Sequence, residues 1–101
     1  MLHTAGIVPT NPDGTVDDDI GRQSARVWQT IGSILTDAGF EPTDVVSYTT
    51  YVVSGADLDP VMRARDAFFG GHRAASVLVT VPALARAAWK VETAVVAARS
   101  G

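Results

Sequence analysis

Hydrophobic residues follow strand-like patterns in four parts of the chain. The clearest runs from Val45 to Val53, where every residue but one Ser is β-branched or aromatic. Val-rich runs between Val77 and Val81 and between Val91 and Val96 predict two more strands, joined by a Pro-Ala turn region. The segment from Leu2 to Val8 predicts a further strand, which ends at Pro9.

Helical spacing appears in two other segments. The acidic run Asp17 to Asp19 predicts a helix start, because carboxylates cap free N–H groups and meet the positive end of the helix dipole. Apolar side chains then recur at helical spacing up to Gly39, the predicted C-cap. A second helix is predicted from Asp59 to about Phe69, with Pro60 at its first position and Gly70-Gly71 after its end.

The order strand, helix, strand, helix, strand, strand predicts one mixed sheet. Each strand–helix–strand crossover is expected to be right-handed, which puts both helices on the same face of the sheet. The other face then has no cover from this chain, so we expect further copies of the protein to close it. With 101 residues the chain is long enough for one core, and residues 1–101 are predicted to form a single domain.

Charge and composition narrow the classes of function. The formal net charge is −3 and the eight Lys and Arg residues are scattered, so nucleic acid is not an expected partner. The chain has no Cys and only two distant His residues, so we expect neither a metal site nor a cofactor. There is no basic leader with an apolar segment and no run of eighteen apolar residues, so we expect a cytoplasmic protein with no membrane contact.

Glu92 is the one carboxylate set inside a long apolar run. Burying an unpaired carboxylate costs several kcal/mol, so this side chain must face a wet cleft, pair with a cation or take up a proton. It is therefore either a functional group in a cleft or a structural carboxylate paired with Arg or Lys at a subunit interface. Arg73 and Arg86 flank this part of the chain and are candidates for bringing positive charge to the cleft.

Four segments together resemble the RidA family, also called YjgF or endoribonuclease L-PSP. They are LHTAGIVPTNPDGTV, DAGFEPTDVVSYTTYV, ARDAFFGG and RAASVLVTVPALARAAWKVETAVVA, and they cover almost the whole chain. The resemblance implies an α+β, chorismate-mutase-like fold, in which a mixed β-sheet is backed by two α-helices. It also implies a homotrimer with small-molecule clefts between subunits. The best-known members hydrolyse reactive enamines and imines, such as 2-aminoacrylate, to the keto acid and ammonia.

The resemblance also gives roles to individual positions. Glu92 matches the family's Glu that positions or activates water. Gly6 matches the Gly of a Ser-Gly pair that lines the cleft, and Ala5 stands at the Ser position. Ser76 stands where the family has an Arg that clamps the substrate carboxylate. The positions of a cleft Asn, of a polar residue that is often Cys and of a second Glu are occupied by Met62, Leu78 and Ala94.

Replacement of the Arg by Ser76 bears directly on activity. A guanidinium forms two charge-assisted hydrogen bonds to a carboxylate, which a hydroxyl cannot imitate. Each bond is worth roughly 1.5–3 kcal/mol, so binding of a 2-imino acid is expected to weaken about a hundredfold or more. From Ser76 we therefore expect a less acidic or uncharged ligand, in an apolar cleft walled by Met62 and Leu78. No His is spaced to activate Ser76 as a nucleophile.

Three functions stay open. The first is a RidA-like deaminase of the 2-iminobutanoate/2-iminopropanoate type, or a related small-molecule hydrolase, with Glu92 holding water. The second is a non-catalytic trimer that binds a metabolite or a partner protein in the same cleft. The third, ribonuclease or translation-inhibitor activity, is disfavoured by the acidic charge and the lack of a His pair. The family usually has a strand ahead of the position of Met1, so we expect either a trimmed sheet edge or additional preceding residues.

Overall fold

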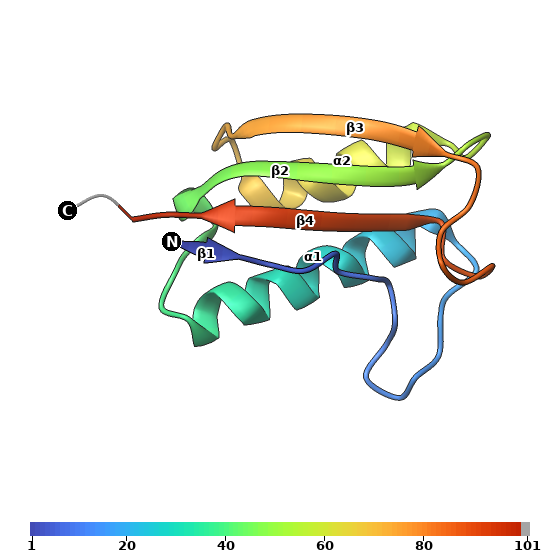
Figure 1. The fold of residues 1–101 in the computed structure, drawn as a ribbon, viewed down its shortest axis with the longest axis horizontal. Helices are drawn as coiled ribbons and strands as arrows, with labels where there is room; N and C mark the ends of the chain where they lie inside the picture. Colours follow the sequence, from blue (N-terminus) through green and yellow to red (C-terminus); the bar gives the residue numbers. More distant parts are fainter. Residues whose placement is uncertain (100–101) are drawn as a thin grey trace.

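In the computed structural model, which describes residues 1–99, four strands form one mixed sheet and two helices cover one of its faces (Figure 1). The elements are β1 (Leu2–His3), α1 (Ile20–Asp37), the short 3-10 helix η1 (Pro42–Asp44), β2 (Val45–Val53), α2 (Leu58–Phe69), β3 (Ala75–Val81) and β4 (Val91–Ala97). The strand order is β1-β4-β2-β3; β2 is parallel to β3 and antiparallel to β4. The predicted α+β fold with both helices on one face is confirmed.

The helix ends follow the predicted capping residues closely. Asp19, the last of the three carboxylates, is the N-cap of α1, and its side chain accepts a hydrogen bond of 2.9 Å from the Arg22 N–H. Beyond the end of α1, Gly39 has a φ of 80°, a conformation that favours glycine. Asp57 caps α2, so this helix starts slightly earlier than predicted, and Gly70 ends it with a φ of 64°. Sequence signals at helix ends were therefore reliable here.

The N-terminal strand is interrupted, where the sequence predicts a continuous strand. The Thr4 N–H donates to the Val95 carbonyl over 3.0 Å, and the Ile7 N–H donates to the Thr93 carbonyl over 2.7 Å. The two residues Ala5 and Gly6 therefore lie opposite a single residue of β4, Ala94. Two residues against one is the arrangement of a β-bulge, which shortens regular pairing and redirects the chain.

The last two strands are joined in sequence but are not neighbours in the sheet. β2 lies between β3 and β4 and pairs with both along its length (Figure 1). The connection over residues 82–90 is longer than a tight hairpin and passes from one side of β2 to the other. β2 consequently forms the centre of the described sheet, with its alternate side chains directed at the helices.

The core lies between the sheet and the two helices. Every second residue of β4 is buried, and an aromatic cluster fills the space under α2. In that cluster the Trp28 ring meets the Tyr48 and Phe69 rings edge-on, at centroid distances of 5.5 and 5.2 Å. The buried apolar residues are Val27, Trp28, Ile31, Leu35, Val45, Tyr48, Val52, Val61, Phe69, Val91, Val95 and Ala97.

The long polar side chain of Gln23 is fully buried on α1. Its Nε2 donates to the backbone carbonyls of Asp17 and Ala88, over 2.7 and 2.9 Å. Its Oε1 accepts a hydrogen bond of 2.9 Å from the Lys90 N–H. These three bonds satisfy the buried amide and fasten the segment before β4 to the start of α1.

Among residues 1–99, no helix lies on the second face of the sheet. Tyr51 of β2 pairs with Glu92 on one side and Val79 on the other, and the alternation of the strands directs all three away from the helices. Val77 and Val79 of β3 are 57% and 37% exposed. We call this the open face; the prediction that the chain leaves one apolar sheet face uncovered is confirmed. Neither helix of the described residues could cross a membrane, since both are too short or too polar.

Candidate functional site

Glu92 lies against the bulge at Ala5-Gly6. A Cβ built on Gly6 would lie 2.8 Å from the carboxyl carbon of Glu92, closer than real Cβ atoms approach other atoms. A side chain at position 6 would therefore displace the Glu92 carboxylate from its present place. Within residues 1–99 this carboxylate has no recorded hydrogen bond or ion pair, and the Gly6 N–H donates to no backbone or side-chain acceptor. A carboxylate and a free N–H are thus held next to each other on the open face.

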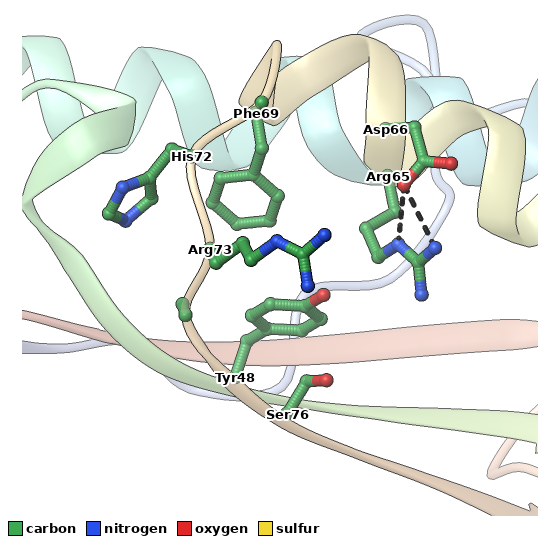
Figure 2. Close-up of a pocket in the computed structure, with 9 residues that line it drawn as sticks. Tyr48, Arg65, Asp66, Phe69, His72, Arg73 and Ser76 are labelled. Atoms are coloured by element: carbon green, nitrogen blue, oxygen red, sulfur yellow. Dashed lines mark hydrogen bonds and ion pairs between the residues drawn. The ribbon is translucent and has the colours of Figure 1, made fainter.

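Ser76 lies on the opposite side of the sheet, at the end of a groove of about 520 Å³. We call this the Ser76 groove; its lining residues are Tyr48, Arg65, Asp66, Phe69, Gly71, His72, Arg73, Ala74 and Ser76. Figure 2 shows the Arg73 side chain extending across the groove toward Arg65, over the Tyr48 ring, while Ser76 lies below. The groove is therefore rich in hydrogen-bond donors.

Met62 and Leu78 meet in a smaller pocket of about 30 Å³, together with Trp28, Val61 and Thr50. This Met62 pocket shares Tyr48, Arg65 and Ser76 with the Ser76 groove, so the two are adjacent. The structure thus places Met62 and Leu78, the two residues expected to wall the cleft, in the lining of one pocket. The adjoining Ser76 groove, however, is polar and is lined by two arginines. The uncharged Ser at position 76 did not indicate these charges.

The candidate residues form two groups on opposite faces of the sheet. Ser76 pairs with Tyr48, which is directed at the helices, whereas Glu92 pairs with Tyr51, which is directed away from them. Ala5, Gly6 and Glu92 thus gather on one side, and Met62, Ser76 and Leu78 gather on the other. No single ligand can contact both groups within one chain.

Arg65 and Tyr48 are site residues that the sequence reading missed. Arg65 follows Met62 by three residues on α2, so the two share a helix face, and helical spacing from Met62 points to it. Tyr48 lies on β2 beside Ser76 of β3, a neighbour that only the strand register reveals. Contacts across a sheet depend on register and cannot be read from spacing along the chain.

The two arginines suggested by the sequence have different surroundings. Arg73 lines the Ser76 groove. Arg86 instead lies over the Trp89 ring, with 5.6 Å from its guanidinium carbon to the ring centroid, which is a cation–π contact. Of this pair, only Arg73 is placed to contact a ligand near Ser76.

Two other ionisable side chains, His72 and Asp13, form hydrogen bonds within the protein. His72 has its Nε2 2.9 Å from the Val45 carbonyl, and since a carbonyl only accepts, this nitrogen carries the hydrogen. Far from the groove, hydrogen bonds from the side chain and backbone of Thr15 lower the pKa of Asp13. In the part of the chain that the structure describes, no three His, Cys, Asp or Glu residues gather in a way that could hold a metal ion.

A solved structure with this fold is the YjgF gene product of Escherichia coli. The two share 29% sequence identity and superpose with a TM-score of 0.88, over 97% of this chain and 80% of the other. The mixed sheet and the two helices on one face are thus those of a YjgF-type protein.

Sequence comparison agrees with the fold. The profile of the family described as Endoribonuclease L-PSP matches residues 1–99, so the chain belongs to this family, also known as RidA or YjgF. It is 33% identical over 86 residues to a RutC family protein of Pyrococcus abyssi, a match covering 83% of this chain and 68% of that protein. It is 32% identical over 75 residues to the 2-iminobutanoate/2-iminopropanoate deaminase of Escherichia coli, covering 73% of this chain but 59% of the deaminase.

Proposed function

We propose that the protein hydrolyses a small reactive enamine or imine, with Glu92 handling the water. The observation that carries the proposal is the unpaired Glu92 carboxylate held against Gly6 beside a free N–H. The similarity to the Escherichia coli deaminase supports the reaction class. A half-buried carboxylate without a partner among residues 1–99 adds nothing to the packing of an otherwise apolar strand, which favours a role in chemistry.

The reaction follows from these two groups. Glu92 accepts a proton from water as the water oxygen attacks the carbon of the C=N bond, and it passes this proton to the imine nitrogen, which gives a carbinolamine. The hydroxyl proton of the carbinolamine is then transferred to its amino nitrogen as the C–N bond breaks, and ammonia and a ketone-type product leave. The Gly6 N–H is available to donate a hydrogen bond to an oxygen that carries developing negative charge.

We propose further that the working unit is a homotrimer with the site between subunits. Two features support an assembly: the apolar open face around Tyr51, Val77 and Val79, and the separation of the two groups of site residues. In an assembly, Glu92 of one subunit faces the Ser76 groove of the next. Each complete site then takes its water-handling group and its ligand groove from different chains.

The test is ammonia release from enzymatically generated 2-aminoacrylate. Glu92→Gln removes the base and is expected to lower the rate about 100-fold or more while the thermal unfolding temperature changes little. Glu41→Gln is the matched control, because Glu41 is exposed and is the N-cap of η1, away from both groups. Equal rates for wild type and Glu92→Gln would exclude this role.

A non-catalytic metabolite-binding trimer is the second candidate. Ser76 and Met62 stand at the positions where the resemblance places an Arg and an Asn, which favours this alternative. A wild-type protein that releases no ammonia, and a Ser76→Arg variant that does, would establish a scaffold adapted to another ligand. Ribonuclease activity is supported only by the name of the family. His3 lies on β1 and His72 in the segment between α2 and β3, so we expect no RNA cleavage.

A further inference from the structure

We propose that Met62 is a site of reversible oxidation, at which a peroxide converts the thioether to a sulfoxide whose oxygen occupies the Met62 pocket. The chain has two Met residues and no Cys, so Met62 carries the only sulfur atom apart from that of Met1. Met62 lies on α2 and is 36% exposed. Because the susceptibility of a sulfur atom follows its exposure, this thioether is within reach of a small oxidant.

The Met62 pocket has room for the oxygen that oxidation adds. Its volume is about 30 Å³, which is enough for a group the size of a water molecule. A sulfoxide differs from a thioether by a single oxygen atom, so the product fits without displacing the buried Trp28 on the other side of the pocket lining. In a close-packed core, by contrast, an added polar oxygen disrupts the packing. The fold is therefore expected to tolerate oxidation at this position.

Three hydrogen-bond donors line the same pocket. They are the guanidinium group of Arg65 and the hydroxyls of Ser76 and Thr50. Thr50 Oγ1 lies 3.2 Å from Thr93 Oγ1, and either hydroxyl can donate. When Thr93 donates, the Thr50 hydrogen is available to the pocket. A thioether sulfur is a weak acceptor and uses these donors poorly, whereas the sulfoxide oxygen is polar and can accept from them.

Arg65 is the donor that can also assist the reaction. It follows Met62 by three residues on α2, a spacing that puts both side chains on one helix face. Its Nη2 and Nε lie 2.8 and 2.9 Å from one oxygen of Asp66 (Figure 2), so within residues 1–99 this carboxylate uses only part of the five N–H donors. The Asp66 side chain is 69% exposed, and water weakens so open an ion pair. The guanidinium group can therefore donate to a peroxide in the pocket.

The reaction transfers one oxygen atom and two electrons. The Met62 sulfur attacks one oxygen of hydrogen peroxide, the S–O bond forms and the O–O bond breaks. The sulfur is oxidised and the peroxide is reduced; the hydroxide that leaves takes the proton of the transferred oxygen and becomes water. Arg65 stabilises the negative charge that develops on the leaving oxygen. Methionine sulfoxide reductases reverse the modification, with one enzyme for each of the two sulfoxide epimers.

The first measurement is the rate of Met62 oxidation by hydrogen peroxide, followed by peptide mass spectrometry with N-acetylmethionine amide in the same solution as the reference. If exposure alone set the rate, Met62 would react about threefold more slowly than the reference. With assistance from the pocket, we expect it to react at least as fast as the reference. Arg65→Gln should slow Met62 about threefold or more and leave Met1 unchanged.

Arg63→Gln is the matched control. It removes the same charge from an exposed position of α2 that lines neither the Met62 pocket nor the Ser76 groove, and it should leave the oxidation rate nearly unchanged. A Met62 that reacts more slowly than the reference would overturn the proposal, as would an equal rate in wild type and Arg65→Gln. Equal slowing by Arg63→Gln would show a general charge effect in place of a site. Circular dichroism checks that each variant is folded.

Stereochemistry gives a second test. The two lone pairs of a free thioether react alike, whereas the pocket holds the peroxide on one side of the Met62 sulfur. We expect mainly one sulfoxide epimer from the folded protein, reduced by only one of the two reductases, and both epimers from protein that is oxidised while unfolded in urea. The same epimer mixture from folded and unfolded protein would contradict the proposal.

Ammonia release connects the modification with activity, and this part rests on the proposed function. Because the Met62 pocket adjoins the Ser76 groove, the added oxygen should lower ammonia release by the wild type, and reductase treatment should restore it. Met62→Leu has a similar volume but no sulfur, so its own rate should not respond to peroxide. Unchanged release by the oxidised wild type would remove the link to activity.

The two proposals can fail separately. Assisted oxidation of Met62 in a protein that releases no ammonia would remove the hydrolase and retain the modification site. Ammonia release by a protein whose Met62 reacts only as its exposure dictates would retain the hydrolase and remove the modification site.

Discussion

The contact between Gly6 and Glu92 gives a residue with no side chain a defined role. Gly6→Ala would place a methyl group where the Glu92 carboxyl group now lies, so the carboxylate must move or the bulge must open. We expect a loss of about 1 kcal/mol or less in the free energy of unfolding, because the clashing atoms are at the end of a flexible side chain, and a clear loss of ammonia release. In a Glu92→Ala background the same substitution should cost almost nothing, because the clashing atoms are gone.

A double-mutant cycle followed by urea denaturation measures this coupling. The control is Ala5→Ser, a change at the exposed neighbouring residue, which should stay within about 0.5 kcal/mol of wild type. An identical cost of Gly6→Ala in both backgrounds would assign the constraint to the backbone of the bulge and not to Glu92.

For individual residues, the sequence predicted Glu92 as a site residue but did not indicate Arg65. Glu92 stood out because a charge inside an apolar strand is conspicuous, and the structure places it beside Gly6, another position that the resemblance assigns to the cleft. Arg65 was hidden because an arginine on an exposed helix surface has no unusual pattern. Its importance comes from the strand that packs next to α2, which is information about tertiary structure.

At the scale of elements, α1 is fastened to the segment before β4 by Gln23. Gln23→Leu keeps the volume but leaves the Lys90 N–H and two carbonyls without their partners. We expect the free energy of unfolding to fall by about 2–3 kcal/mol, measured by urea denaturation, and the Lys90 amide to exchange its hydrogen faster. Gln29→Leu, at an exposed position of the same helix, should change stability by about 0.5 kcal/mol or less.

A fall of less than about 1 kcal/mol for Gln23→Leu would mean that water replaces the lost bonds. Gln23 also shows why an apolar stripe does not identify every buried position. The predicted helix face contained only apolar residues, while the structure buries Gln23 and Ser24 on that face as well. A buried amide is recognisable only when its three backbone partners are known.

The positions of helices and strands were easier to predict than the pairing of the strands in the sheet. The strand Val45–Val53 agrees with its predicted limits, and the helices differ from theirs by few residues, because caps and periodicity are local signals. The bulge after β1 and the insertion of β2 between β3 and β4 were not predicted. Both depend on register and on strand order, which follow from packing of the whole sheet.

At the scale of the whole molecule, the open face predicts an assembly that substitutions can dissociate. Val79→Asp places a charge on the apolar open face without touching the core, since Val79 is 37% exposed. Sedimentation velocity should show trimers for the wild type and monomers for the variant, which should stay folded but release no ammonia.

Ser33→Asp, an exposed position on the outer side of α1, is the control and should leave the trimer intact. A monomeric wild type that is fully active would refute the shared site. A Val79→Asp variant that stays trimeric would place the subunit contact elsewhere on the surface.

The central position of β4 has a consequence for synthesis of the protein. β2, α2 and β3 are consecutive and can pack together while the ribosome is still adding residues, but β1 has no partner other than β4. Until residues 91–97 have emerged, one edge of β2 is unpaired and the N-terminal segment has no strand to join. Glu92 meets Gly6 in this same late step, so the nascent chain acquires its proposed water-handling group only when its sheet is completed.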